Sequence, residues 1–321
     1  MNLAIIGSGK IVNDLVSFIN EIPAINLVAI YGREQSLDKL EKLQKENGID
    51  EVYTDYNRLL QNPSIDTVYV ALPNDLHFAY AKKGLLAKKN VIVEKPFVQT
   101  LEQFYELKNI AVKHHLHLYE AISNQYSPNF IALKKWISVI SPVHLAVLNY
   151  SQYSSRYDLF KSGMVLPAFD ANRGGGALQD LNIYNVHLLV GLFGKPIKAD
   201  YVANVVKNVD TSGILTLKYL NLIASAVAGK DVHSLIDSNS ILEGENGYIK
   251  IESPSNELSI ITMTDSENKS KMLTTDKHRM FYEFDSFEQH IAKDDFEFMN
   301  RMLDHTEEVL KIIDSARKNI K

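Results

Sequence analysis

The stretch that decides the fold is Met1-Asn2-Leu3-Ala4-Ile5-Ile6-Gly7-Ser8-Gly9-Lys10-Ile11-Val12. Its first half is an apolar run, typical of a parallel strand buried on both faces. Two glycines follow at once, and a helix-length stretch begins directly after them. In a dinucleotide-binding turn the first glycine makes the tight turn, and the second lets the backbone approach a pyrophosphate at the helix N-terminus. The glycines between a strand and a helix therefore predict a dinucleotide site, with a purely structural turn as the alternative.

Strand-like and helix-like segments alternate from this point to about residue 120. The strand candidates are short and, apart from the third, dominated by large apolar side chains: Leu3–Ile6, Asn26–Tyr31, Glu51–Thr54, Thr67–Ala71, Val91–Glu94 and His117–Glu120. The helix candidates between them are Lys10–Asn20, Ser36–Glu46, His77–Lys88 and Leu101–Lys113. Ser36 and Gly48 bracket the second helix, and Thr100 with Gln103 forms a capping box before the last. This alternation predicts an α/β fold with a doubly wound parallel sheet, the Rossmann arrangement, over residues 1–121.

The sequence changes character after Pro128. Strand candidates such as Val143–Tyr150, Gly213–Tyr219, Ile223–Ala228 and Tyr248–Glu252 are separated by hairpin-like turns at Asn221 and at Gly244–Gly247. A helix is expected over Gly176–Phe193, and a final amphipathic helix over about Asp304–Lys318. Residues 122–321 are therefore expected to form a second domain with a largely antiparallel sheet and a few helices, and its last helix to pack back on the first domain.

Length and composition exclude several classes of protein. The 321 residues favour two domains, and 45% hydrophobic with 23% charged residues is an ordinary globular composition. The absence of cysteine removes disulfides, zinc–thiolate sites and thiol nucleophiles. A net charge of −5 gives no attraction toward nucleic acid, and no apolar run has the ~20 residues of a membrane helix. The N-terminus does not resemble a signal peptide. We expect a soluble, cytoplasmic protein.

The end of the second strand bears on the choice of cofactor. A protein that selects NAD normally has an Asp or Glu there, which holds the ribose 2′-hydroxyl. This chain has Gly32 and Arg33 instead. Because a guanidinium pairs with a 2′-phosphate, we predict NADP(H) over NAD(H). The alternative is that Arg33 stacks on the adenine ring.

Two further segments end strands on the edge where open α/β sheets bind ligands. Glu94-Lys95-Pro96 follows the fifth strand, and the proline restrains Lys95 in a way that suits a catalytic role. Leu72-Pro73-Asn74-Asp75-Leu76-His77 follows the fourth strand. Simple helix capping by Asn74 or Asp75 is an equally good explanation of this second segment.

The second half contains one notable cluster, Gly174-Gly175-Gly176-Ala177-Leu178-Gln179-Asp180-Leu181-Asn182-Ile183-Tyr184-Asn185-Val186-His187. In a regular helix Asp180, Tyr184 and His187 lie on one face, at i, i+4 and i+7. Such a stripe suggests a lined cavity, and a buried hydrogen-bond cluster is the alternative. The histidines of His114-His115-Leu116-His117 straddle a helix end and a strand start, so we interpret them as surface residues rather than metal ligands.

These segments together resemble the glucose–fructose oxidoreductase / inositol dehydrogenase / rhizopine-catabolism (Gfo/Idh/MocA) family. The resemblance rests on the Gly7-Ser8-Gly9 turn, Pro73-Asn74 with His77, Glu94-Lys95-Pro96, and the segment from Gly174 to Asp180. Many members have a histidine base at the position of Tyr184. The tyrosine, with Tyr119-Glu120-Ala121, resembles the branch of glucose–fructose oxidoreductase and dimeric dihydrodiol dehydrogenase. Asn182 replaces a usual glycine, and Gln125 stands where that branch tends to have arginine.

The resemblance implies hydride transfer between a nicotinamide and a hydroxyl or carbonyl carbon of a sugar, polyol or related small molecule. It also implies a Rossmann domain followed by an α/β domain with an open, mainly antiparallel sheet, and a homodimer or homotetramer formed through that sheet. We expect no metal, because the cofactor carries the hard chemistry. Lys95, Tyr184 and Asp180 are expected to be catalytic, and His187 and Gln125 to contact substrate. The expected cofactor-binding residues are Gly7, Ser8, Gly9, Lys10, Ile11, Arg33, Leu72, Pro73, Asn74, His77, Glu94 and Lys95. Two other functions stay open on this fold: an NADP-binding sensor without catalysis, and a glycosidase that oxidises its sugar transiently.

Overall fold

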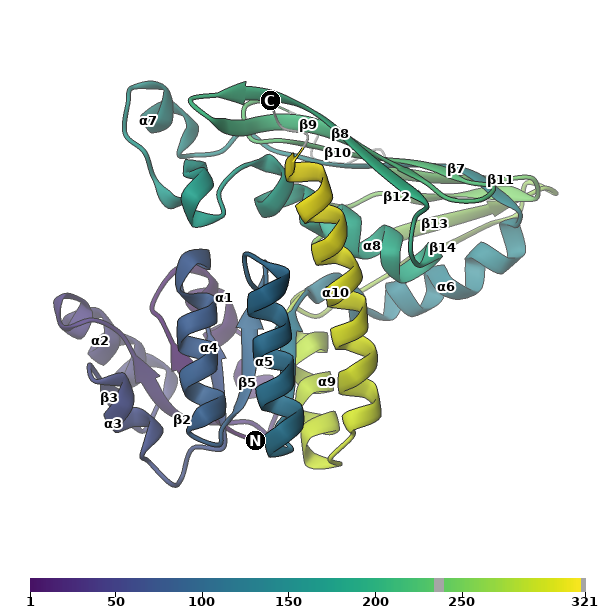
Figure 1. The fold of residues 1–321 in the computed structure, drawn as a ribbon. Coiled ribbons are helices and arrows are strands. Elements are labelled where there is room, and N and C mark those ends of the chain that lie inside the picture. Colours follow the sequence, from purple (N-terminus) through teal and green to yellow (C-terminus); the bar gives the residue numbers. More distant parts are fainter. Residues whose placement is uncertain (234–239, 319–321) are drawn as a thin grey trace. The chain divides into compact units, whose positions relative to one another are not determined.

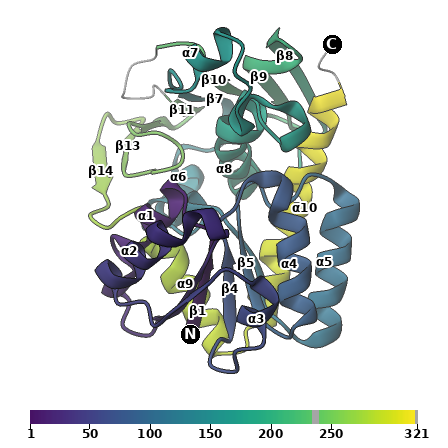
Figure 2. The same ribbon diagram turned by 90° about the vertical axis from the view of Figure 1, so that its left-hand side faces the viewer.

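The short apolar runs of the first 120 residues form a parallel sheet in the computed structural model, which describes residues 1–233 and 240–318. The strand order is β3-β2-β1-β4-β5-β6, so the order reverses between β1 and β4. Figure 2 shows β1, β4 and β5 side by side. The strands are β1 (Asn2–Ile6), β2 (Asn26–Tyr31), β3 (Glu51–Tyr53), β4 (Thr67–Val70), β5 (Asn90–Glu94) and β6 (Leu118–Ala121). The predicted Rossmann sheet is confirmed.

Helices connect these strands, mostly at the predicted positions. They are α1 (Lys10–Val16), α2 (Leu37–Asn47), α3 (Tyr56–Leu60), α4 (His77–Leu86) and α5 (Leu101–His114). The predicted helix Lys10–Asn20 is longer than α1, which ends at Val16. Phe18 and Ile19 are buried, and a separate 3₁₀ turn covers Ile19–Glu21. Ser36 makes no side-chain cap for α2, whereas Gly48 ends that helix in the left-handed conformation, with φ 66°. Thr100 caps α5 through the Gln103 N–H, at 3.2 Å.

A second, eight-stranded sheet has the order β14-β13-β12-β11-β7-β10-β9-β8. All its pairs are antiparallel except that of β7 with β10, so the prediction of an open, mainly antiparallel sheet is confirmed. Its strands are β7 (Val143–Ser151), β8 (Lys198–Val206), β9 (Val209–Lys218), β10 (Ile223–Gly229), β11 (Ser240–Gly244), β12 (Gly247–Ile251), β13 (Ile260–Asp265) and β14 (Ser270–Thr274). Turns join β9 to β10 around Asn221 and β11 to β12 at Gly244–Gly247, as predicted.

Helices pack against one face of this sheet (Figure 1). They are α6 (Pro128–Ile140) and α8 (Ile183–Phe193), and the short α7 (Tyr157–Lys161) lies in the loop after β7. The other face, which we call the open face, presents apolar side chains that are between 38% and 76% exposed: Leu145, Val147, Val202, Ile214, Ile223 and Met272. Strand pairing aligns several of them, since Ile214 lies opposite Val202, and Ile223 opposite Leu145.

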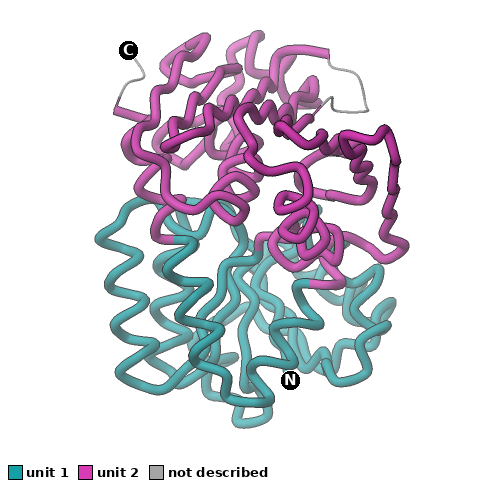
Figure 3. The backbone as a smooth tube through the Cα atoms, turned by 90° about the vertical axis from the view of Figure 1, so that its right-hand side faces the viewer, with its two compact units in different colours: residues 1–121, 283–306 teal, residues 122–282, 307–321 magenta. Residues whose placement is uncertain are grey.

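The chain forms two compact units, coloured separately in Figure 3. The first contains Met1–Ala121 and Glu283–Thr306, and the second contains Ile122–Tyr282 and Glu307–Lys321. The returning segment supplies α9 (Phe281–Ala292) and the first part of α10 (Phe296–Lys318). The prediction started the final helix too late, because Asp295 begins α10 by accepting a hydrogen bond from the Phe298 N–H at 2.9 Å.

Within the described residues, no helix combines the length and the apolarity that crossing a bilayer requires.

Candidate functional site

The expected site residues fall in both units. The glycine turn, Arg33 and the loops after β4 and β5 belong to the first unit, and Gln125, Asp180, Tyr184 and His187 belong to the second.

The two glycines of the first turn are needed for different reasons. Gly7 has φ +133°, and a Cβ there would lie 2.3 Å from the Ala71 carbonyl oxygen, so the fold itself requires glycine. Gly9 has an ordinary φ of −76°, and a Cβ there would meet no atom within 4 Å. The protein therefore gives no internal reason for a glycine at position 9. Open space beside an exposed backbone is what a bound pyrophosphate would require.

The surroundings of the turn fit a nucleotide phosphate. The first turn of α1 contains no acidic residue, and no side chain caps it. Ser8 and Ile11 are half-buried and Lys10 is exposed. Val12, which stands where the third glycine is usual, is fully buried. These features leave backbone N–H groups and a cation available to an anion.

Arg33 follows β2 and is exposed. Gly32 is buried beside Leu40, whose side chain would lie 3.0 Å from a Cβ at that position. The next acid, Glu34, accepts a hydrogen bond from the Thr54 hydroxyl at 2.8 Å. The side chain available at the end of β2 is thus a guanidinium, as the sequence indicates.

His77 joins the loop after β4 to the loop after β5. Its Nε2 lies 2.8 Å from the Leu72 carbonyl oxygen, and its Nδ1 lies 2.9 Å from the Pro96 carbonyl oxygen. The side chain is fully buried, and burial lowers its pKa below the ordinary histidine value. A side chain without exposed surface acts on a ligand only through the groups it holds. We therefore regard His77 as a residue that positions both loops.

The loop after β5 is held from several sides. Glu94 is buried and accepts hydrogen bonds from the Tyr69 hydroxyl and from the Lys95 N–H. The Lys95–Pro96 peptide bond is cis, and the Lys95 residue is half-buried. Glu120 accepts from the Phe97 N–H at 3.0 Å. Sequence reasoning missed Tyr69, since nothing local marks a strand tyrosine as a partner of Glu94.

The glycine run of the second unit leads into an irregular helix. Gly176 has φ +113°, and a Cβ there would lie 1.9 Å from Asp210 Oδ1. The other carboxylate oxygen of Asp210 accepts a hydrogen bond from the Leu178 N–H at 2.7 Å. Leu178–Asn182 is a π-helical turn, and only from Ile183 onward is α8 regular. Turns of this kind occur frequently at functional sites.

The π-helical turn changes the arrangement that the sequence predicts. The i, i+4, i+7 spacing assumes a regular helix from Gly176, which the wider turn interrupts. Asn182, fully buried, donates from Nδ2 to the Ala226 carbonyl of β10 at 2.9 Å and accepts from Asn185. The asparagine, which stands where the family usually has glycine, thus attaches the turn to the sheet.

Asp180 forms an ion pair that the sequence does not indicate. Its Oδ2 lies 2.7 Å from Lys230 Nζ, at the end of β10. The Lys230 side chain is 2% exposed and that of Asp180 is 36% exposed. The sequence offers no local signal for Lys230, which follows fifty residues later as a single lysine.

Tyr184 is buried near the start of α8. Its ring packs edge-on against Tyr150, with the centroids 5.8 Å apart, and its carbonyl accepts from Asn124 Nδ2 at 2.9 Å. Asp180 therefore lies in the π-helical turn with a partly exposed side chain, and Tyr184 lies at the start of α8 with a buried one.

His187 and Gln125, the residues expected to contact substrate, both make packing contacts within the second unit. His187 is fully buried, and its carbonyl accepts from Gln125 Nε2 at 2.9 Å. A Cβ at Gly191 would lie 2.4 Å from Gln125 Oε1, so this amide packs closely against α8. His187 is therefore buried on α8 and Gln125 packs against that helix, and their contact with substrate stays a prediction.

The interpretation of the three-histidine segment as surface is wrong for His117. That side chain is 2% exposed, stacks on Phe296 with ring centroids 4.4 Å apart, and contacts the Tyr119 hydroxyl. Across the described residues, no group of three or more His, Asp or Glu side chains could hold a metal ion.

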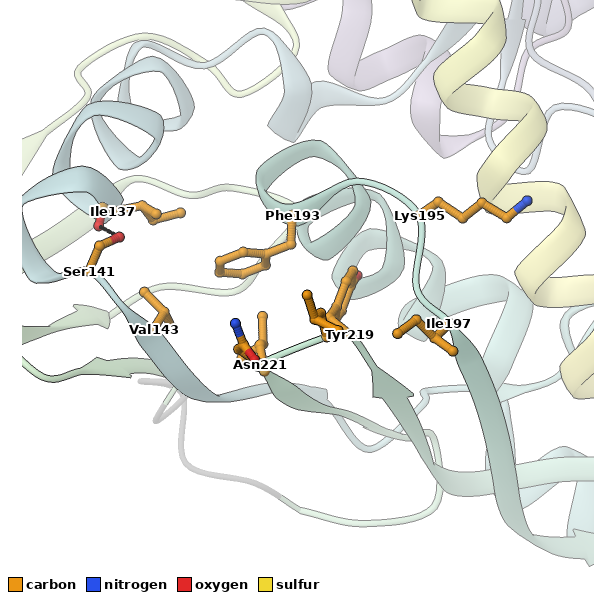
Figure 4. A pocket seen from close by; sticks show the side chains of 10 residues that line it. Ile137, Ser141, Val143, Phe193, Lys195, Ile197, Tyr219 and Asn221 are labelled. Atoms are coloured by element: carbon orange, nitrogen blue, oxygen red, sulfur yellow. Dashed lines mark hydrogen bonds between the residues drawn. The ribbon is translucent and has the colours of Figure 1, made fainter.

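A pocket of about 410 Å³ lies elsewhere in the second unit (Figure 4). Ile137, Val143, Phe193, Tyr219 and Leu222 give it a mainly apolar lining, to which Lys195 adds the one charged side chain among its described residues. None of the expected site residues lines it, and we assign it no part in the chemistry.

Residues 1–121 match the model of a protein family described as an oxidoreductase family with an NAD-binding Rossmann fold. Two relatives match nearly the whole chain. The chain is 29% identical over 323 residues to scyllo-inositol 2-dehydrogenase (NADP(+)) IolU of Bacillus subtilis, covering 100% of this chain and 97% of the relative. It is 26% identical to trans-1,2-dihydrobenzene-1,2-diol dehydrogenase of Xenopus tropicalis, covering 98% and 97%.

A solved structure shows the same fold over the full length. Levoglucosan dehydrogenase, determined in complex with NADH and levoglucosan, superposes with a TM-score of 0.86 at 16% identity. The superposition covers 100% of this chain and 97% of the other.

Proposed function

Because this chain belongs to the Gfo/Idh/MocA family of NAD(P)-dependent oxidoreductases, we propose that it interconverts a hydroxyl and a carbonyl group of a cyclic polyol or sugar. The bound nicotinamide supplies or accepts the hydride. The observation that carries the proposal is the open space at Gly9. The fold requires the glycine at position 7 of the same turn, but it does not require the one at position 9. Full-length similarity to an inositol dehydrogenase supports the substrate class.

In this proposal side chains of the protein donate and accept the proton. A carbonyl that accepts hydride needs a proton on its oxygen, and Tyr184 donates it. An unperturbed phenol, with a pKa of ~10, is a weak base for the reverse reaction at neutral pH. To Lys95 we assign the role of a cation that favours the phenolate, and to Asp180 that of binding a substrate hydroxyl.

Turnover measurements test this assignment. Tyr184→Phe and Lys95→Ala should each lower kcat by about 10²-fold or more, while NADPH affinity stays nearly unchanged. A panel of inositols, sugars, dihydrodiols and dicarbonyls serves as substrates. Full activity in both variants would remove these residues from the mechanism. NADPH binding without turnover would indicate a sensor, and sugar release without net NADPH consumption would indicate a glycosidase.

We further propose that NADP(H) is the preferred cofactor. Arg33 is the exposed side chain after β2, and the inositol dehydrogenase relative is named for NADP(+). The levoglucosan dehydrogenase was solved with NADH, so the fold by itself does not decide the preference. Arg33→Ala should weaken NADPH binding by about tenfold, as expected for one charge-assisted contact, and leave NADH binding unchanged. Equal or tighter binding of NADH to the wild type would overturn the preference.

We also propose a homodimer or homotetramer formed through the open face, in the cytoplasm where the cofactor is available. The open face presents exposed apolar side chains, including Val202 and Ile214, on a sheet whose other face is covered by helices. Exposed apolar patches of this kind mark association surfaces.

A further inference from the structure

Lys230 is a buried lysine to which the proposed reaction gives no role. It follows directly after β10 and is 2% exposed. Its ammonium group donates to Asp180 Oδ2 at 2.7 Å and to the Ala168 carbonyl oxygen at 2.6 Å, and it lies 4.5 Å from the centre of the Phe169 ring. One anion, one carbonyl and one aromatic face thus surround the charge.

The backbone of Lys230 is fixed by the sheet region. Its N–H donates to the Thr211 carbonyl at 2.7 Å, and its carbonyl accepts from the Ser154 N–H at 2.9 Å. These backbone hydrogen bonds fix the position of Lys230 next to the sheet. The Asp180 carboxylate is thus paired with a lysine whose backbone is held in place.

The two partners of the ion pair differ in how much they depend on each other. A buried cation is costly unless an anion compensates it, so removing the carboxylate side leaves the lysine poorly solvated. The Asp180 side chain is 36% exposed and Lys230 is almost completely buried. The ion pair therefore fixes a partly exposed carboxylate to a buried cation. Together with the Leu178–Asp210 and Asn182–Ala226 hydrogen bonds, it restrains the π-helical turn at three successive even-numbered positions.

We propose that Lys230 is a positioning residue for catalysis, which orients the Asp180 carboxylate toward a substrate hydroxyl. This inference rests on the proposed function, in which Asp180 binds that hydroxyl. Lys230 itself touches neither substrate nor cofactor. Loss of its cation removes this restraint on the Asp180 carboxylate, so the substrate binds in unproductive orientations and kcat falls.

The same aromatic cluster offers a matched control. Phe169 stacks on Phe160, with ring centroids 4.8 Å apart, and Lys207 Nζ lies 5.2 Å from the Phe160 ring. Lys207 donates to the Phe160 carbonyl at 2.9 Å, as Lys230 donates to that of Ala168. Both lysines thus contact a carbonyl and one ring of the stack. Lys230 differs in its contact with Asp180 and in being buried, since Lys207 is exposed.

The experiment compares Lys230→Met, Lys207→Met, Asp180→Asn and the double variant Lys230→Met/Asp180→Asn, in the full chain with NADPH. We expect Lys230→Met to lower kcat by 10- to 100-fold with NADPH affinity unchanged, and Lys207→Met to stay within about twofold of the wild type. Because Lys230 acts through Asp180, the double variant should match Asp180→Asn within about twofold.

Several outcomes would overturn the inference. Equal kcat in Lys230→Met and Lys207→Met is one, and a further tenfold loss in the double variant relative to Asp180→Asn is another. If Lys230→Met does not fold, the comparison of the double variant with Asp180→Asn still decides, since the double variant lacks both charges. A wild type without turnover on any substrate overturns the proposed function first. An active wild type with additive variants overturns the role of Lys230 alone.

Discussion

At the scale of single residues, Gly7 and Gly9 illustrate how one motif combines two requirements. The left-handed backbone and the close Ala71 carbonyl explain Gly7 from inside the protein. Nothing in the described structure requires a glycine at position 9, and the proposed pyrophosphate would account for it. A sequence pattern alone assigns both glycines to the same site and cannot separate these causes.

Alanine substitutions separate them. Gly7→Ala should lower the melting temperature by several degrees, because it strains the backbone and places a Cβ against a carbonyl oxygen. Gly9→Ala should leave the melting temperature within about a degree and weaken NADPH binding tenfold or more. Thermal unfolding and cofactor titration of both variants give the four values. A destabilised Gly9→Ala with normal affinity would show that Gly9 serves the fold.

His77 leads to a prediction about pH. Because its pKa is lowered in the folded protein, the unfolded chain binds more protons below an ordinary value of about 6.5. The free energy of unfolding therefore rises with pH in this window, and stability is lost as the pH falls below about 6.5. Buried His117, whose pKa is also lowered by desolvation, adds to the same slope.

The difference in melting temperature between pH 7.5 and pH 5.5 measures this effect. It should be smaller in His77→Gln than in the wild type, even if the variant is less stable at both pH values. His144→Gln is a suitable control, because that histidine is exposed and its pKa is raised by Glu245. An unchanged difference in His77→Gln would show that His77 does not titrate in this window.

At the scale of elements, the π-helical turn shows what local sequence cannot supply. The glycines, Asp180 and Tyr184 were identifiable, and a helix was expected there. The widened turn depends on Asp210, Ala226 and Lys230, which come up to fifty residues later in the chain. Local periodicity contains no information about such distant partners, so the predicted single face of Asp180, Tyr184 and His187 was wrong in detail.

Asn182→Gly tests how far the turn depends on its attachment to β10. The change removes the hydrogen bond to Ala226 and the acceptor for Asn185, and adds glycine flexibility. We expect the free energy of unfolding to fall by about 1–3 kcal/mol. Urea unfolding followed by circular dichroism measures it. A stability equal to that of the wild type would mean that these hydrogen bonds do not hold the turn.

Other elements were missed even though signals for them were present. Asp55 accepts from the Asn57 N–H and starts α3, and Ser127 with Pro128 starts α6. The first is only five residues long, and its pattern is too short to recognise. The parallel strands were found almost residue by residue, because a strand buried on both faces must be continuously apolar.

At the scale of the whole molecule, the open face of the second sheet predicts association. Ile214→Lys places a charge beside Val202 on the open face. If copies associate through this face, the variant should shift to monomer in analytical ultracentrifugation, with an unchanged circular dichroism spectrum. Leu86→Lys, on α4 of the first unit and 53% exposed, should not change the association state. A variant that sediments like the wild type would exclude the face as the interface.

The segment Glu283–Thr306 has a consequence for how this architecture can be divided. In the first unit, Phe284 packs edge-on against Tyr69, Phe287 stacks on Tyr119, and Thr306 donates to Glu120. A polypeptide truncated after Ala121 lacks all three partners and would expose the aromatic rings they cover. Genetic recombination therefore could not transplant the nucleotide-binding half as one continuous cassette, since its last segment is translated only after residues 122–282 of the other half.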